Sequence, residues 1–155
     1  MKFSTREDVA APIESAFEMI CDFERYERAA MRRGAEIRRV DGHEAPTVGA
    51  AWDARFTMRG KERSLRLEVT ELDRPEAMEV TLESNGLKGE VTCELIALSP
   101  QRTRIIMGVD LRPQTLPARL LIQSMKLTKT SLDRKYKDRV ATYFQEMEER
   151  YRDTA

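Results

Sequence analysis

The stretch AAWDARFTM, residues 50–58, decides the fold. Apolar and polar side chains alternate along it, so that Trp52 and Phe56 share one face while Asp53 and Arg55 share the other. This period of two is typical of a strand with one face packed on a core and the other in water. The sequence therefore predicts an antiparallel sheet at this point.

The same alternation continues toward both ends of the chain. It predicts further strands at residues 2–10, 35–40, 63–72, 78–82, 91–95 and 105–111. Asn85-Gly86 is a strong signal for a tight hairpin turn, and Ser99-Pro100 marks another turn. Between the first two strands, residues 13–20 and 23–33 have helical spacing, and Pro12 and Gly34 are typical of a helix start and a helix stop.

The pattern changes after residue 113. From about Leu116 to Tyr151 there is no Gly, Pro occurs only near the start, and apolar residues recur every three or four positions. This stripe predicts one long amphipathic helix of roughly 50 Å, at 1.5 Å per residue. Its other faces carry charged side chains, which we interpret as a solvated surface.

Length and charge limit the function classes. A chain of 155 residues matches one domain, which we place at residues 1–155. Lys+Arg and Asp+Glu each count 27, a balance that argues against nucleic-acid binding. No signal peptide or membrane span is predicted, so we expect a cytoplasmic protein with Cys21 and Cys93 as separate, buried, reduced thiols.

The predicted elements suggest an α+β helix-grip architecture. A curved antiparallel sheet of about seven strands, in the order β-α-α-β6-α, would wrap around the long C-terminal helix, since that helix is the only large amphipathic element available to cover it. A strongly curved sheet and a straight helix do not fit flush. We therefore expect a cavity for an apolar ligand between them.

The segments VAAPIESAF, residues 9–17, and DFERY, residues 22–26, resemble the strand, Ala-Pro turn and helix entry of the START/Bet v 1-like superfamily (SRPBCC; polyketide cyclase/dehydrase and lipid transport-like). The resemblance covers nearly the whole chain, but the sequence departs from it at residues 29–31, where many members carry Pro and Trp. It implies an apolar cavity. Members bind lipids, sterols, quinones, polyketides or hormones, and some are cyclases, hydrolases or chaperone activators, so the chemistry stays open.

No residue set forms a catalytic or metal-binding signature, and we predict neither a catalytic residue nor a cofactor. His43 is the only histidine and falls in a polar loop, so a zinc or other histidine-based metal site is not expected. A nucleophile elbow and a glycine-rich phosphate loop are also absent from the sequence. Glu7 and Arg63 fall on inward-facing positions and are candidate polar groups of the cavity, although both could instead reach water at strand ends.

The remaining candidate site residues are those on the inward faces of the sheet and the helix. We expect the cavity to be lined by Trp52, Phe56, Met58, Leu65, Leu67, Val80, Leu82, Val91, Leu95, Met107, Leu121, Met125, Thr128, Leu132 and Tyr136. A filled core would use the same residue types, so composition cannot separate the two interpretations.

Three functions remain open. The favoured one is a carrier, sensor or chaperone for a hydrophobic small molecule such as a lipid, quinone or polyketide-like compound. The second is a metal-free cyclase or dehydratase, with Tyr136, Glu7 or Arg63 as candidates for proton transfer. The third is a protein-interaction module of the chaperone-activator type. The residues leave open whether the chain forms a homodimer.

Overall fold

A computed structural model of the chain describes residues 1–40, 42, 47–58 and 60–154. His43 and the loop around it lie outside the described residues, as does the side chain of Met58. The elements in chain order are β1 (Lys2–Val9), α1 (Ile13–Ile20), α2 (Phe23–Arg32), β2 (Glu36–Arg39), β3 (Ala51–Met58), β4 (Lys61–Asp73), β5 (Ala77–Ser84), β6 (Leu87–Ser99), β7 (Arg102–Pro113), α3 (Leu116–Lys126) and α4 (Lys129–Thr154).

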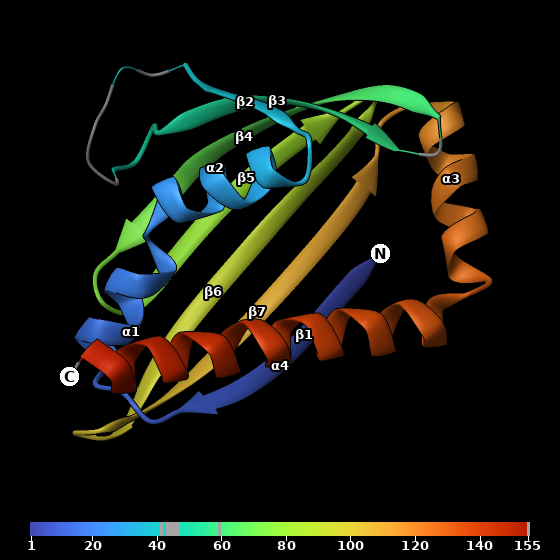
Figure 1. The fold of residues 1–155 in the computed structure, drawn as a ribbon. Coiled ribbons are helices and arrows are strands. Elements are labelled where there is room, and N and C mark those ends of the chain that lie inside the picture. Colours follow the sequence, from blue (N-terminus) through green and yellow to red (C-terminus); the bar gives the residue numbers. More distant parts are fainter. Residues whose placement is uncertain (41, 43–46, 59, 155) are drawn as a thin grey trace.

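The strands form one antiparallel sheet of seven, in the order β1-β7-β6-β5-β4-β3-β2. Strands β2 to β7 follow one another as a meander, and β1 closes the sheet by pairing with β7. Figure 1 shows the curved sheet with α4 running across one of its faces. The predicted helix-grip architecture is therefore confirmed.

Cross-strand pairing confirms the predicted alternation. Trp52 lies opposite Leu67, and Leu67 lies opposite Leu82 on the next strand. Directly opposed residues share a face of the sheet, so one apolar row crosses three strands on the side that meets the helices. We call this side the inner face.

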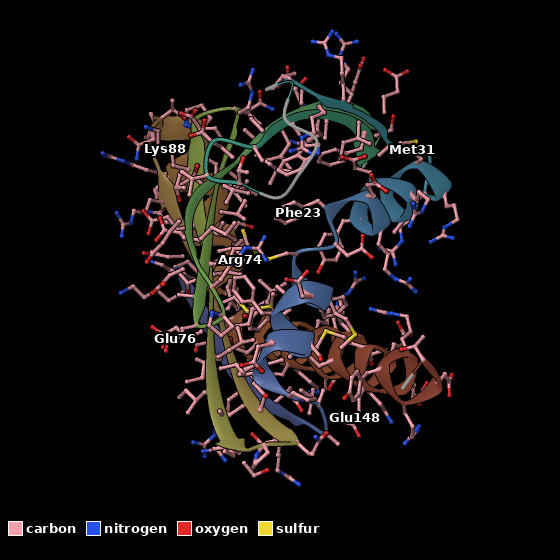
Figure 2. All side chains as sticks on the ribbon, turned by 90° about the vertical axis from the view of Figure 1, so that its left-hand side faces the viewer. Phe23, Met31, Arg74, Glu76, Lys88 and Glu148 are labelled. Atoms are coloured by element: carbon pink, nitrogen blue, oxygen red, sulfur yellow. The ribbon has the colours of Figure 1, made fainter. Side chains whose placement is uncertain are left out.

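The core lies between the inner face and three helical segments: α1, α2 and the C-terminal half of α4. In Figure 2 these helices lie on one side of the sheet, with Phe23 directed from α2 toward it. The largest fully buried side chains come from β1, α1, the central strands and α4: Val9, Phe17, Ile20, Cys21, Val69, Cys93, Thr103, Ile105, Phe144 and Met147. This packing joins the two ends of the chain to the middle of the sheet.

The prediction of one continuous helix from residue 116 to residue 151 is wrong. The chain forms two helices, α3 and α4, which run in different directions and meet at Leu127 and Thr128 (Figure 1). At the break, the backbone N–H of Thr128 and its hydroxyl both donate to the carbonyl of Met125, at 3.1 and 3.3 Å. A threonine hydroxyl can compete in this way with the regular helical bonds. The apolar spacing continues through the break, which is why the sequence pattern conceals it.

This break changes the position of two of the predicted site residues, whose role in ligand binding stays a prediction. Leu121 and Thr128 are predicted on the helix stripe that faces the sheet, but both are exposed. Only the part of the stripe that belongs to α4 can follow the inner face, because α3 has turned away from it.

The Asn85-Gly86 hairpin turn is confirmed and has a second role. Both residues have positive φ values, 46° and 79°. A side chain at Gly86 would place its Cβ 2.4 Å from the hydroxyl of Thr115, the residue that caps α3. The backbone N–H of Gln114 also donates to the carbonyl of Gly86, at 2.6 Å. The start of α3 is therefore held against this turn.

Two leucines of β6 allow a matched test of the core. Leu95 is 4% exposed and Leu98 is 42% exposed. We expect Leu95→Ala to lower the free energy of unfolding by about 2–5 kcal/mol, because it leaves a cavity in the core. Leu98→Ala should cost less than about 1 kcal/mol. Urea unfolding followed by circular dichroism measures both, and equal losses would show that this end of the inner face is not a packed core.

Candidate functional site

The side chains of the inner face become less buried along the strands, from the end under α1 and α2 toward the end near α3. Val69 and Cys93 are buried, whereas Leu65 and Val91, farther along the same strands toward α3, are only half-buried. Helices α1 and α2 and the C-terminal half of α4 cover the end that contains Val69 and Cys93. We call the other part the open half of the inner face: it consists of the half-buried, inward-facing residues Phe56, Arg63, Leu65, Leu82, Val91, Val109 and Leu111.

The predicted cavity residues are likewise divided between the packed core and the half-buried surface. Two belong to the packed core: Trp52 and Leu95. Ten are half-buried: Phe56, Leu65, Leu67, Val80, Leu82, Val91, Met107, Met125, Leu132 and Tyr136. Their role in ligand binding stays a prediction.

Trp52 is enclosed by α2. Its indole Nε1 donates to the Glu27 carboxylate at 2.6 Å, and the Phe23 ring meets it edge-on with centroids 5.1 Å apart. The guanidinium of Arg39 lies 5.1 Å from its ring centroid on the inward side of β2. Sequence reasoning missed Glu27 and Phe23 as partners. Their helical spacing of four residues was the available signal, since it places both on one side of α2.

Arg63 is the polar group that distinguishes the open half. It lies opposite Phe56 and two residues before Leu65, so it shares their inward face. Its Nε is buried and finds no hydrogen-bond partner among the described residues. A buried donor without a partner costs roughly 1–3 kcal/mol, and more when it is charged. An anionic group brought to this position would remove that cost.

Glu7 does not join Arg63 in a common site. It is half-buried on the inward face of β1, opposite Ile105. Three strands lie between β1 and β4 in the sheet. The structure therefore offers Arg63 and Glu7 as separate groups rather than as an acid–base pair.

The inward tyrosines use their hydroxyls within the fold. Tyr136 donates to the carbonyl of Met107 at 2.7 Å, and burial raises its pKa to about 12. Tyr26 donates to the carbonyl of Ile20 at 2.7 Å, and the hydroxyls of Tyr26 and Tyr143 are hydrogen-bonded to each other. Burial is also the main cause that raises the pKa of both of these tyrosines. These groups stay protonated near neutral pH and are poor general bases.

Cys21 and Cys93 are free, buried thiols, as expected. Desolvation raises the pKa of Cys21 to about 11 and that of Cys93 to about 12. Since the thiolate is the reactive form, neither side chain is suited to nucleophilic chemistry at neutral pH.

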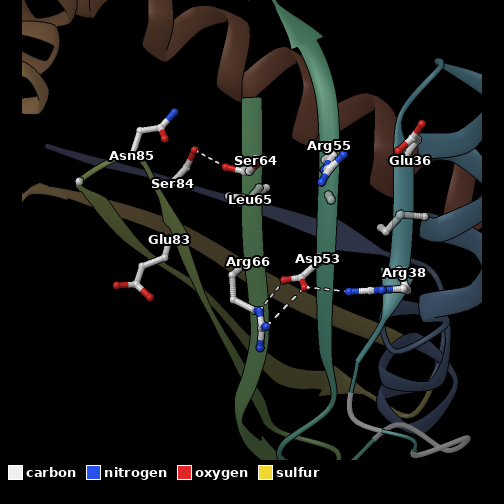
Figure 3. A pocket seen from close by; sticks show the side chains of 13 residues that line it. Glu36, Arg38, Asp53, Arg55, Ser64, Leu65, Arg66, Glu83, Ser84 and Asn85 are labelled. Atoms are coloured by element: carbon white, nitrogen blue, oxygen red, sulfur yellow. Dashed lines mark hydrogen bonds and ion pairs between the residues drawn. The ribbon is translucent and has the colours of Figure 1, made fainter. Parts of the chain in front are cut away.

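The outer face of the sheet carries a hollow of about 730 Å³ over β2 to β5 (Figure 3). Its walls are charged. The carboxylate of Asp53 forms an ion pair with the guanidinium of Arg66 at 2.6 Å and lies 3.7 Å from the guanidinium of Arg38. These groups are at least one-third exposed and neutralise one another, so the hollow is a solvated ion-pair network with little attraction for an apolar molecule.

No cluster of three or more His, Cys, Asp or Glu side chains able to hold a metal occurs among the described residues. Within the same part of the chain, none of the helices combines the length and apolar character needed to cross a membrane.

Comparison with solved structures identifies the fold as START/Bet v 1-like. A protein of Thermus thermophilus aligns with a TM-score of 0.66 at 15% identity, over 100% of this chain and 99% of that one. The Zhui aromatase/cyclase of a Streptomyces species aligns with a TM-score of 0.64 at 13% identity, over 97% and 95% of the two chains. Norcoclaurine synthase from Thalictrum flavum, solved with dopamine and hydroxybenzaldehyde, gives 0.60 at 12% identity, over 81% and 76%.

At these identities the likeness concerns the fold alone. A comparison of the sequence with protein-family models gave no match, and neither did a comparison with curated proteins.

The buried thiols and Tyr136 predict a loss of stability in alkali. Their pKa values are raised on folding, from 9.0 to about 11 and 12 for the thiols and from 10.0 to about 12 for Tyr136. The unfolded chain therefore releases these protons first, and stability should fall as pH rises from about 9 to about 12.

Tyr136→Phe tests this expectation, because it removes one of the titrating groups. The variant should be less stable than the parent at pH 8, having lost the bond to Met107, but this difference should shrink as pH rises above 10. Urea unfolding at a series of pH values measures it. A difference that stays constant with pH would show that Tyr136 titrates normally.

Proposed function

We propose that this protein binds an apolar small molecule with one anionic group on the open half of the inner face, as a carrier, sensor or chaperone. The single observation that carries the proposal is the orphaned Nε of Arg63 within a half-buried apolar surface. The ligand's anionic group would meet Arg63, and its apolar body would lie against Leu65, Leu82 and Val91.

The apolar part of the surface supports the affinity. Half-buried leucine and valine side chains still expose area that a ligand can remove from water, at roughly 25 cal/mol for each Å². Gly89 leaves room for its neighbours, because a Cβ there would lie 2.7 Å from the side chain of Leu82 and 3.1 Å from that of Leu111. The side chains of these two leucines can therefore pack over Gly89 and form a continuous apolar surface.

We favour binding over catalysis because the three candidates for proton transfer do not form an acid–base set. The hydroxyl of Tyr136 is bonded to a backbone carbonyl and its pKa is raised, while Glu7 and Arg63 lie on strands that are separated by three others. The fold neighbours include an aromatase/cyclase and a synthase solved with two small aromatic compounds. They support a small aromatic ligand for this chain. A metal-free cyclase or dehydratase activity stays the second candidate function.

A matched pair of probes tests the proposal. 1-Anilinonaphthalene-8-sulfonate is an aromatic anion, and N-phenyl-1-naphthylamine is its neutral counterpart. We expect both to bind, with energy transfer from Trp52, the only tryptophan, and loss of that transfer in Trp52→Phe. Arg63→Gln should weaken the anionic probe about tenfold, because a charge-assisted hydrogen bond is lost, and leave the neutral probe unchanged.

Arg55→Gln is the matched control, since Arg55 lies on the neighbouring strand but points to the outer face and lies 3.7 Å from Glu62. It should alter neither affinity. Equal weakening of both probes by Arg63→Gln would assign Arg63 a structural role, and the absence of binding by either probe would refute the proposed site.

A further inference from the structure

Helix α3 and the residue that follows it expose four leucines to solvent: Leu121 is 42% exposed, and the other three share one side of the helix. Leu116 is 69% exposed, Leu120 is 58% exposed and Leu127, directly after the helix, is 87% exposed. A single exposed leucine needs no explanation, but three on one side of one short helix do. We call these three residues the leucine ridge.

The ridge points directly away from the protein. At 3.6 residues per turn, its members lie within ~40° of one another around the helix axis. Ala118 and Ile122, the buried residues of α3, lie on the opposite side. The apolar character of α3 is therefore divided into an inner face that packs on the fold and an outer face that nothing in the described part of the chain covers.

Charge around the ridge has one sign. Residues 111–132 contain Arg112, Arg119, Lys126 and Lys129 and no Asp or Glu, in a chain with 27 acidic residues in 155. Arg112 is paired with Asp110, and Lys129 with Asp133, at the borders of this segment. The positions of Arg119 and Lys126 place them on the same flank of the ridge, about two helical turns apart.

The helix is held in place with the ridge outward. Thr115 caps it by accepting a hydrogen bond from the N–H of Ala118 at 3.3 Å, and Gln114 is bonded to Gly86. Figure 1 shows α3 at the periphery, away from α1 and α2. The ridge is thus presented as a fixed surface.

We propose that the leucine ridge docks this protein on an anionic lipid surface. Leucines flanked by cations are the pattern by which a helix lies in the membrane interface, with the leucines in the acyl region and the cations at lipid phosphates. A second copy of the chain fits less well, since an antiparallel two-fold contact through the ridge would bring its cationic flank close to an identical one. The inference does not depend on the proposed ligand, because the ridge lies outside the inner face.

Vesicle co-sedimentation of the full chain tests the proposal. The parent protein should bind vesicles of phosphatidylcholine mixed with phosphatidylglycerol, and bind vesicles of phosphatidylcholine alone far more weakly. The triple variant Leu116→Ser, Leu120→Ser, Leu127→Ser should lose at least about tenfold in partitioning to the mixed vesicles. Arg119→Glu with Lys126→Glu should lose the preference for the anionic lipid, and added NaCl should weaken the parent in the same way.

The matched control is Ile96→Ser with Leu98→Ser, which removes exposed apolar residues from β6 and should leave partitioning unchanged. Melting temperatures of all variants should stay near that of the parent, since every substituted side chain is exposed. The proposal is refuted by a parent that ignores anionic vesicles, by a triple variant that binds as well as the parent, or by an equal loss in the control. A parent that is dimeric by light scattering and becomes monomeric in the triple variant, without vesicle binding, would assign the ridge to self-association.

Discussion

The packing of the C-terminal half of α4 against the inner face of the sheet is the contact on which the rest of the structure depends. Phe144 and Met147 meet Phe17 and Ile20 of α1 in one buried cluster, which reaches Ile105 near the start of β7. At the other end of α4, the Tyr136 ring lies 5.6 Å from that of Phe3, and its hydroxyl is bonded to β7. Directly after β1, the backbone N–H of Ala10 donates to the Glu148 carboxylate of α4 at 3.1 Å. Because α4 is tied to both ends of β1, it fixes which part of the inner face is covered.

This constraint also explains the open half. A straight helix can follow a curved sheet over a limited length only, and α1 and α2 lie beside the C-terminal half of α4. The N-terminal part of α4 is therefore left with half-buried Leu132 and Tyr136 over a less covered surface. The break at Leu127 and Thr128 increases the effect, since it removes from the sheet the turns of helix that a continuous α4 would have supplied.

Buried polar groups differ between the two parts of the inner face. Beneath α1, α2 and α4, Thr103 donates to the carbonyl of Ala11 at 2.8 Å and Trp52 donates to Glu27. In the loop before β3, the hydroxyl of Thr47 is buried without a partner among the described residues. In the open half, the Nε of Arg63 is left without a partner among the described residues. The proposed ligand site and the leucine ridge lie at the same end of the molecule, where the covering helices are fewest, and each is an apolar surface accompanied by a cation.

Much of the fold follows from the sequence alone. Side-chain period determines which face of each strand is apolar, and Asn85-Gly86 sets a turn, because both signals depend only on local backbone geometry. The same local pattern places Arg63 on the inner face. The resemblance of residues 9–17 and 22–26 to the START/Bet v 1-like superfamily is likewise a property of the sequence, because it rests on residue types at fixed spacing.

Tertiary structure decided the rest. The helix break at Thr128 depends on a hydroxyl that could equally have faced solvent, and the apolar spacing gives the same signal for one helix or two. Whether an inward residue is buried, like Trp52, or half-buried, like Phe56, depends on which helix lies above it, and the residues themselves do not encode that position locally. The exposure of Leu116, Leu120 and Leu127 likewise follows from where α3 is anchored, because burial is a property of the packed chain and not of the residue type.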